Sequence, residues 1–440
     1  MTLYRFSSAT VRAVMAGVFG VGLLTACNSN DLLKVQSPSR IPASGLYVPG
    51  NATLLVNSAI ADFECAFGAY AAVGGLIGDE LADATQTADR YPYDQRTLTS
   101  KDARYQSSSC ESIGVYSPLQ TARISADKIR QQLVQWSDQQ VSARQLLIAT
   151  ANAYEGYAEL LLGEGFCNTV FSTVNPDGSV SYGDPITPAQ AFDSAITRFN
   201  DAVTAAQAAG ASGADILNLA YVGRARAALD KGDLPAARAD AAKVPASFRF
   251  DMTADVTPGR RYNRVWAQNG LASGGSYNEA ASVDTAYHSL NDPRVPVKST
   301  GDTSRTKIPI WVQTKFPTAD AHIRIASGDE AQLIIAEADL AANPSNSLAI
   351  INTFRARSGG SELPLLPTAT AAQLKSALIE ERRREFFLEG QRLYDLIRFQ
   401  IEPSPPAGAN FPGGGTYGSQ LCMPLPDVER FNNPKIGASG

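Results

Sequence analysis

Apolar side chains recur every three or four residues along several stretches of the chain, which is the spacing of one face of an α-helix. The pattern predicts helices or helix pairs over residues 145–163, 188–209, 215–244, 329–357 and 371–399. In the first stretch, Leu147, Tyr154 and Leu161 share one face, while alanine and glycine occupy many other positions and permit close helix packing. The sequence therefore predicts a mainly α fold.

Two of these stretches are predicted to be helix pairs. Residues 215–244 carry small side chains on two helices separated by a Lys-Gly-Asp turn, and residues 329–357 divide at an Asn-Pro step. Small residues at these offsets around a tight turn are similar to a tetratricopeptide repeat. We expect such pairs to stack into one solenoid-like body, with 371–399 as a last, strongly charged helix.

Three long segments between the helices lack a regular period. Residues 79–109, 248–325 and 403–418 are polar or rich in glycine and proline. Loops of this length inside a compact domain are usually functional or disordered. We therefore predict loop insertions near these three segments, and we expect them to carry the function.

The candidate ligand contacts are aromatic side chains in two of these loops. They are Tyr91 and Tyr93 in the first loop, and Trp266, Tyr277 and Trp311 in the second. Flat aromatic faces stack on the C–H surface of sugars, and amides or charged groups bind the hydroxyls. The alternative is that each aromatic ring anchors its loop on the helical core.

Polar side chains surround both aromatic clusters. The amides are Asn263, Gln268, Asn269 and Asn278, and the charged groups are Asp89, Arg90, Asp94 and Arg96. Nearby, Asp79, Glu80 and Asp83 could hold calcium, although we favour a solvated turn for them. The chain has only two histidines and no C-x-x-C motif, so we predict neither a metal site nor a cofactor.

The N-terminus predicts export and lipidation. Arg5 and Arg12 precede an apolar run over residues 13–24, which is too short to span a bilayer and is typical of a signal peptide. The run ends in Leu-Thr-Ala-Cys, which resembles a bacterial lipobox. We expect a signal peptide over 1–26, a lipidated tether over 27–44 that begins at Cys27, and one helical domain over 45–440.

No later stretch looks apolar enough to cross a membrane, so lipid on Cys27 is the expected anchor. The chain has 38 Lys and Arg against 43 Asp and Glu. A mildly acidic balance argues against nucleic acid as the ligand.

Four cysteines remain after the expected cleavage, and an oxidising compartment favours two disulfides. Three pairings are possible. We favour Cys65 with Cys110, which would tie an early helix to a following loop, and Cys167 with Cys422, which would hold the C-terminal tail on the body. Buried free thiols remain the alternative.

Several motifs near the C-terminus resemble the SusD/RagB family. Residues 381–398 follow the pattern E-R-x-x-E-x-x-x-E-G-x-R-x-x-D-L-x-R, and residues 352–359 follow N-x-x-R-x-R-x-G. Residues 329–338 and the Pro-Leu-Pro ending at 424–426 are also similar. The four cysteines depart from the usual pattern.

The resemblance implies a helical fold built on tetratricopeptide-like pairs. It also implies a lipid-anchored outer-membrane protein that faces the cell exterior. Such a protein binds a glycan or another nutrient oligomer and delivers it to a SusC-like TonB-dependent transporter.

The residues themselves favour binding over catalysis. The charged helix holds arginines close to each of its carboxylates, which should keep them ionised and unsuited to act as acids. We find no nucleophile elbow, phosphate loop or dinucleotide fingerprint. Two alternatives remain open: a repeat-type scaffold for envelope assembly, and a surface glycoside hydrolase, which needs only two carboxylates.

Overall fold

The computed structural model describes residues 43–102, 105, 109–175, 177–257, 259–272 and 275–436. The expected signal peptide, the expected lipid-acceptor Cys27 and most of the tether lie outside the described residues. The chain divides into a unit Met1–Val48, in which one short helix, α3 (Ala43–Leu46), is described, and a unit Pro49–Gly440 that holds the other described elements.

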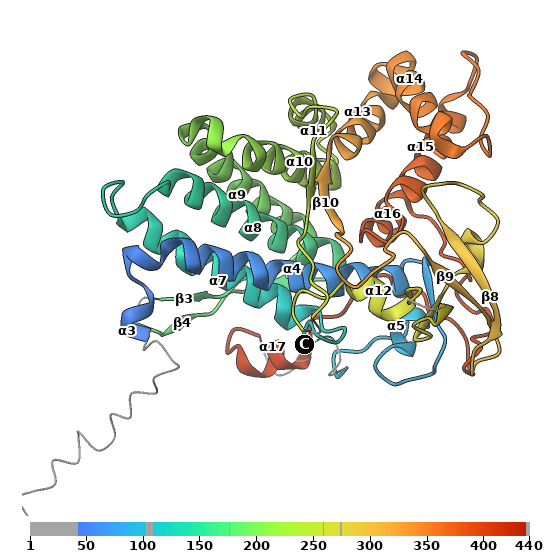
Figure 1. Cartoon of the computed structure of the whole chain (residues 1–440), viewed down its shortest axis with the longest axis horizontal. Coiled ribbons are helices and arrows are strands. Elements are labelled where there is room, and N and C mark those ends of the chain that lie inside the picture. Colours follow the sequence, from blue (N-terminus) through green and yellow to red (C-terminus); the bar gives the residue numbers. More distant parts are fainter. Residues whose placement is uncertain are drawn as a thin grey trace, which may run out of the picture. The chain divides into compact units, whose positions relative to one another are not determined.

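The larger unit is built from antiparallel helices that pack on their neighbours in sequence. Figure 1 shows α8, α9 and α10 running side by side, with α13, α14 and α15 continuing the row. These helices are α7 (Tyr116–Gln135), α8 (Arg144–Gly165), α9 (Pro188–Ala208), α10 (Ala214–Asp230), α11 (Leu234–Ala241), α13 (Gly328–Ala342), α14 (Pro344–Arg355) and α15 (Ala371–Glu385). The arrangement confirms the predicted mainly α fold of stacked helix pairs.

Two core helices, α7 and the long helix before it, were not among those predicted from the period. Helix α4 (Ala52–Ile77) follows the 3-10 turn η1 (Pro49–Asn51), and most of its side chains are buried. By length and composition, Pro49–Ile77 could cross a membrane, so the expectation that no later stretch is apolar enough was wrong. However, 89% of its most apolar window is buried inside the unit, as in the core helix of a folded domain.

The helix predicted over 371–399 is in fact two helices. After α15, residues 386–390 form a turn in which Leu388 and Gly390 have φ of 58° and 83°, and α16 (Arg392–Phe399) follows. In an unbroken helix, residues thirteen positions apart would be about 20 Å apart. Here Arg382 Nε lies 2.8 Å from Asp395 Oδ2, because the turn brings the first turn of α16 close to the last turn of α15.

The first two of the three loops predicted to be irregular contain short helices and strands. Residues 79–109 hold β1 (Leu81–Asp83) and α5 (Tyr91–Asp94). Residues 248–325 hold β6 (Arg249–Asp251), α12 (Arg264–Asn269), β7 (Ala281–Val283), η4 (Thr285–Tyr287), β8 (Val297–Thr303), β9 (Pro309–Gln313) and β10 (Arg324–Ser327). The spacing of apolar residues did not reveal these elements, because strands of three to seven residues are too short to show a repeating pattern.

The strands form small antiparallel pairs rather than one sheet. The described pairs are β1 with β7, β6 with β10, β8 with β9, β2 (Thr169–Val170) with β5 (Pro185–Ile186), and β3 (Thr173–Val174) with β4 (Val180–Ser181). The remaining described elements are η2 (Gly210–Gly213), η5 (Ala356–Ser358) and α17 (Asp427–Asn432).

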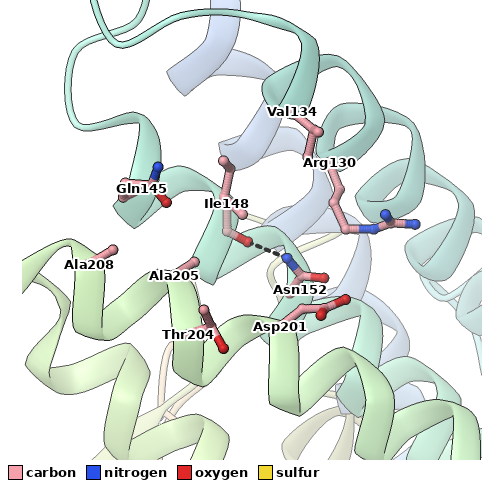
Figure 2. A pocket seen from close by; sticks show the side chains of 9 residues that line it. All are labelled: Arg130, Val134, Gln145, Ile148, Asn152, Asp201, Thr204, Ala205 and Ala208. Atoms are coloured by element: carbon pink, nitrogen blue, oxygen red, sulfur yellow. Dashed lines mark hydrogen bonds between the residues drawn. The ribbon is translucent and has the colours of Figure 1, made fainter.

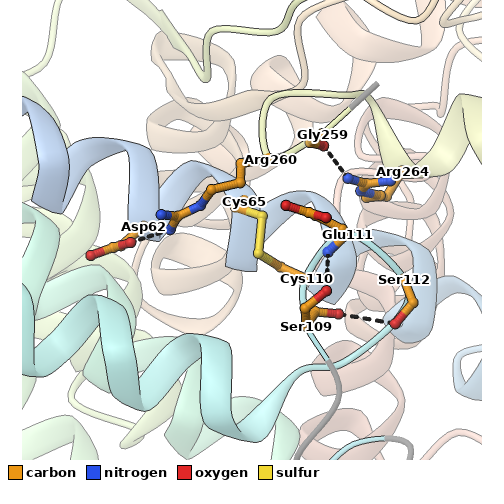
Figure 3. The surroundings of a disulfide bond; sticks show 9 residues. All are labelled: Asp62, Cys65, Ser109, Cys110, Glu111, Ser112, Gly259, Arg260 and Arg264. Atoms are coloured by element: carbon orange, nitrogen blue, oxygen red, sulfur yellow. Dashed lines mark hydrogen bonds and ion pairs between the residues drawn. A yellow bond between two sulfur atoms is a disulfide. The ribbon is translucent and has the colours of Figure 1, made fainter. Parts of the chain in front are cut away.

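Two disulfides join segments that are distant in sequence, and they are the two pairings that the sequence favoured. Cys65 on α4 binds Cys110, with Cα atoms 5.5 Å apart, and Cys167 binds Cys422, with Cα atoms 5.0 Å apart. Figure 3 shows the first disulfide beside the ion pair of Asp62 with Arg260, so α4 holds the second loop as well as the first.

Candidate functional site

A small platform of strands carries the aromatic candidates of the second loop. The pairs β1–β7 and β8–β9 are joined through Ser282, whose hydroxyl donates to Pro309 O (3.0 Å) and accepts from Trp311 N (3.0 Å). The Asn269 amide at the end of α12 donates to Ala281 O (2.7 Å) and to Trp311 O (2.9 Å). Figure 1 shows α5, α12, β8 and β9 together on one side of the unit.

The structure brings Trp266, Tyr277 and Trp311 to this platform, and all three are half-buried. Trp266 lies on α12, and its carbonyl accepts from the Asn278 amide (2.7 Å). The Tyr277 hydroxyl donates to Asp302 on β8 (2.6 Å), and Trp311 lies on β9 opposite Ser299. Each residue is therefore held on the platform by its backbone or its side chain, and each is only half-buried.

The first loop reaches the same platform through Arg90. Its guanidinium Nη1 donates to Gln268 of α12 (3.5 Å), and its Nη2 donates to Thr85 (3.2 Å). Tyr91, the next residue, is half-buried. The two aromatic clusters, separate in sequence, are therefore neighbours in the fold, which the sequence did not predict.

Tyr93 must be removed from the candidate ligand contacts. Its side chain has no exposed surface, and its hydroxyl donates to Ile113 O (3.3 Å). The neighbouring Asp94 and Arg96 are also buried, and Asp94 accepts from Asp83 N (2.7 Å). These side chains hold the loop on the core, which is the alternative role considered for each aromatic ring.

Most of the predicted amide partners are also structural. Asn263 is fully buried, where it caps α12 through Trp266 N (2.9 Å) and donates to Ala321 O (2.7 Å). Asn269 is fully buried as well, and Gln268 is 8% exposed. The amides of Asn263 and Asn269 are occupied by these bonds within the fold, so the half-buried rings rather than these amides form the accessible part of the site.

The third predicted loop closes against the first. Gln95 donates to Thr416 O (3.1 Å) and to Gly414 O (3.3 Å), and Arg96 lies over the Tyr417 ring at 4.7 Å from its centroid. Three loops that are separate in the sequence thus converge. No periodic signal in the sequence could have shown this, because the contacts are mostly to backbone carbonyls.

The acids at positions 79, 80 and 83 do not form a solvated turn, so that prediction was wrong. Asp79 pairs with Arg392 (2.9 Å), and Glu80 is fully buried and accepts from Leu388 N (2.8 Å). Burial raises the pKa of Glu80 to about 8. Within the described ranges, no group of three or more metal-ligating side chains could hold a metal ion.

The charged motif of residues 381–398 forms a buried network. Arg324 on β10 donates to Glu385 (3.0 Å) and to Glu389 (2.8 Å), and Arg382 donates to Asp395 (2.8 Å). Burial alone would raise the pKa of Asp395, but Arg382 and Arg398 outweigh it and lower that pKa to about 2. Arg324 lies on β10, outside the motif, so its ion pairs fasten the turn to the body, whereas the Arg382–Asp395 pair joins α15 to α16.

One carboxylate of this motif, that of Glu381, differs from the expectation that nearby arginines keep the acids of this helix readily ionised. Burial raises the pKa of Glu381, although Arg294 Nη2 lies 2.8 Å from its carboxylate. The Glu381 carboxylate is fully buried. It lines neither the hollow between α7, α8 and α9 nor the hollow beside the Cys167–Cys422 disulfide.

Two hollows lie away from the aromatic platform. One, of about 360 Å³, lies between α7, α8 and α9, where Figure 2 shows the Asn152 amide bonded to Ile148 O. Its lining has no aromatic side chain. The other, of about 420 Å³, is mainly apolar and lies beside Tyr394 and the Cys167–Cys422 disulfide. Neither offers several ring faces, so the platform is the better candidate for a sugar.

Comparison with protein families gives a match near the C-terminus. Residues 317–423 match the model described as the SusD family, a span that includes the buried charged turn. No curated protein matches the chain.

Solved structures match over most of the chain. A SusD-like carbohydrate binding protein from Bacteroides vulgatus has a TM-score of 0.68 at 13% identity, covering 88% of this chain and 97% of its own. A laminarin binding SusD-like protein has a TM-score of 0.66 at 15% identity, covering 88% and 98%.

Surface glycan-binding protein A from Bacteroides thetaiotaomicron, solved with laminarihexaose, has a TM-score of 0.64 at 14% identity and covers 88% and 98%. At these identities the structural likeness establishes the fold. The family match falls on the segment that holds the turn and the buried ion pairs, and the helical frame around that segment has the fold of the SusD-like structures.

Proposed function

We propose that the protein captures a nutrient oligomer, with a glycan as the favoured class, at the aromatic platform and performs no chemistry on it. The observation that carries the proposal is the gathering of Trp266, Tyr277 and Trp311 on one platform, each half-buried. Half-buried aromatic residues held in place by the fold lose little conformational entropy on binding.

Two further points support a glycan ligand. The similar structures include proteins described as carbohydrate binding and laminarin binding. The carboxylates of the charged motif are buried in ion pairs with arginine, where they are poorly placed to act as a glycosidase pair.

The first test is binding to immobilised hexasaccharides of laminarin, amylose, cellulose and xylan. For the ligand bound best, Trp311→Ala should raise the Kd about five- to thirtyfold, because truncating a buried interface tryptophan typically costs about 1–2 kcal/mol or more. Isothermal titration calorimetry measures this change.

Trp136→Ala is the matched control, because Trp136 is also a half-buried tryptophan but caps the end of α7 outside the platform. Its Kd should stay within about twofold of the wild type. Equal losses in both variants, or no retention of any of the four hexasaccharides by the wild type, would refute binding of glucans or xylan at the platform.

We further propose that Cys27 carries the lipid that anchors the protein in the outer membrane, facing the exterior, and that the ligand passes to a SusC-like TonB-dependent transporter. The lipobox-like Leu-Thr-Ala-Cys sequence and the match of residues 317–423 to the SusD family support this. A mild-detergent pull-down of the tagged protein from its native envelope should recover a large β-barrel transporter in near-equal amount.

Cys27→Ser is the control for anchoring, because serine cannot take the thioether-linked lipid. This variant should leave the membrane fraction for the soluble fraction. Recovery of soluble envelope proteins without a barrel would favour the scaffold alternative instead.

A further inference from the structure

Hydrogen bonds hold the backbone of Trp311 in place, but they do not hold its indole ring. Its backbone N–H donates to Ser282 Oγ and its carbonyl accepts from the Asn269 amide. These bonds, together with the pairing of Trp311 opposite Ser299, fix where the residue lies. They do not fix the rotation of the indole about its side-chain torsions, which have several staggered minima.

The imidazole of His288 lies against that indole. The two ring centroids are 4.2 Å apart and the planes differ by 15°, which is a parallel stack. A parallel neighbour at this distance covers part of one indole face and resists rotation of the ring.

His288 is itself held in place. Its Nε2 lies 2.8 Å from Val283 O, so this nitrogen carries the hydrogen and donates it to the carbonyl. The preceding residue, Tyr287, is fully buried and its ring lies 5.0 Å from that of Phe387. The imidazole is therefore attached to the core and cannot follow the indole if the indole turns.

We infer that His288 is a positioning residue of the ligand surface, which fixes the rotation of the Trp311 indole and so determines the face that Trp311 offers to a sugar ring. The inference rests on the proposed glycan binding at this platform. It predicts that the ring of His288, rather than its hydrogen bond, matters for affinity.

Two substitutions separate the ring from the hydrogen bond. His288→Gln removes the ring but keeps an amide that can donate to Val283 O. His288→Phe keeps an aromatic ring but cannot donate to Val283 O. Thermal melting of both variants shows whether each is folded.

The first readout does not need a ligand. The chain has three tryptophans, Trp136, Trp266 and Trp311, so Trp136→Phe with Trp266→Phe leaves Trp311 as the sole source of tryptophan emission. In that background, His288→Gln should increase quenching of Trp311 by acrylamide, and His288→Phe should not.

The second readout is affinity, measured by calorimetry in the wild-type background for laminarihexaose, maltohexaose, cellohexaose and xylohexaose. For the one bound best, His288→Gln should raise the Kd about two- to tenfold, which is the range of an aromatic pair converted to affinity. His288→Phe should stay within about twofold of the wild type.

The outcomes distinguish this inference from the proposed function. If Trp311→Ala weakens binding but His288→Gln leaves the Kd unchanged, or if both His288 variants weaken it equally, the positioning role is refuted and glycan binding stands. If the wild type binds none of the four hexasaccharides, binding of glucans or xylan at the platform is refuted. Unchanged acrylamide quenching of Trp311 in His288→Gln refutes the positioning of the indole independently of any ligand.

Discussion

Phe199 shows how single residues determine the helix spacing. The ring is fully buried between α8, α9 and α10, where two glycines face it. A Cβ added at Gly223 would lie 2.4 Å from Phe199 Cζ, and one at Gly156 would lie 2.9 Å from Phe199 Cε1. The small residues noted in the sequence are therefore needed for the close approach of these helices.

Gly223→Ala should lower the free energy of unfolding by about 1–3 kcal/mol, because the methyl group overpacks the core against a ring that cannot move away. Gly68→Ala is the matched control within a helix, since its nearest neighbour would be Arg264 Cγ at 3.6 Å. That control should be neutral or gain up to about 1 kcal/mol from helix propensity. Urea unfolding of both variants measures the difference, and equal effects would contradict the packing argument.

At the scale of elements, the turn between α15 and α16 depends on buried ion pairs. Asp395 accepts from Arg382 (2.8 Å) and from Arg398 (2.7 Å), and all three side chains are nearly buried. Breaking a buried pair leaves an uncompensated charge, which is more costly than losing an exposed pair.

The pKa of Asp395 gives this element a defined pH dependence. In the unfolded chain an aspartate has a pKa of about 3.9, whereas in the fold Arg382 and Arg398 overcome the effect of burial and lower it to about 2. The folded state therefore binds fewer protons between these values. The stabilisation is present above about pH 4 and is lost as the pH falls towards 2.

Asp395→Asn should lower the free energy of unfolding by about 3 kcal/mol at pH 7. That difference from the wild type should shrink by roughly 2 kcal/mol between pH 4 and pH 2. Urea unfolding over this pH range measures both. Asp184→Asn is the control, because Asp184 is 72% exposed where it meets Lys435 and should contribute under about 1 kcal/mol. A constant difference at every pH would rule out the charge explanation.

At the scale of the whole molecule, the disulfides connect the C-terminal tail and the first loop to the helical body. Cys422 is followed by Met423, whose N–H donates to Gly165 O (2.9 Å), and Cys167 N donates to Met423 O (3.0 Å). The sequence separations are 255 residues for Cys167–Cys422 and 45 residues for Cys65–Cys110.

Removing the Cys167–Cys422 disulfide should cost about 1.5 kcal/mol more than removing Cys65–Cys110, because the longer loop restricts the unfolded chain more. The comparison uses Cys167→Ala with Cys422→Ala and Cys65→Ala with Cys110→Ala in oxidising urea unfolding. Both unfolding experiments are then repeated in reductant, which breaks the disulfide that each variant retains. Any difference in the free energy of unfolding that persists is caused by the alanine substitutions rather than by the cross-links. A larger corrected loss for Cys65–Cys110 would contradict the entropic account.

The sequence by itself determined the helical class, most of the helices in the stacked pairs and the family motif. These are local properties, because a period of 3.6 residues and a Gly-Asp turn can be recognised without knowing what packs against them. It did not reveal the break after Glu385, since the turn depends on backbone conformations at Leu388 and Gly390 and on partners elsewhere in the chain.

Only the tertiary structure decided which candidate residues are accessible. Tyr91 and Tyr93 are equivalent in the sequence, yet one is half-buried and the other has no exposed surface. The sequence predicted Asn269 to be a ligand-binding amide, but its side chain joins α12 to two strands. The physical reason is that burial and hydrogen-bond satisfaction depend on neighbours that are distant along the chain, whereas the period of a helix depends only on residues close to it.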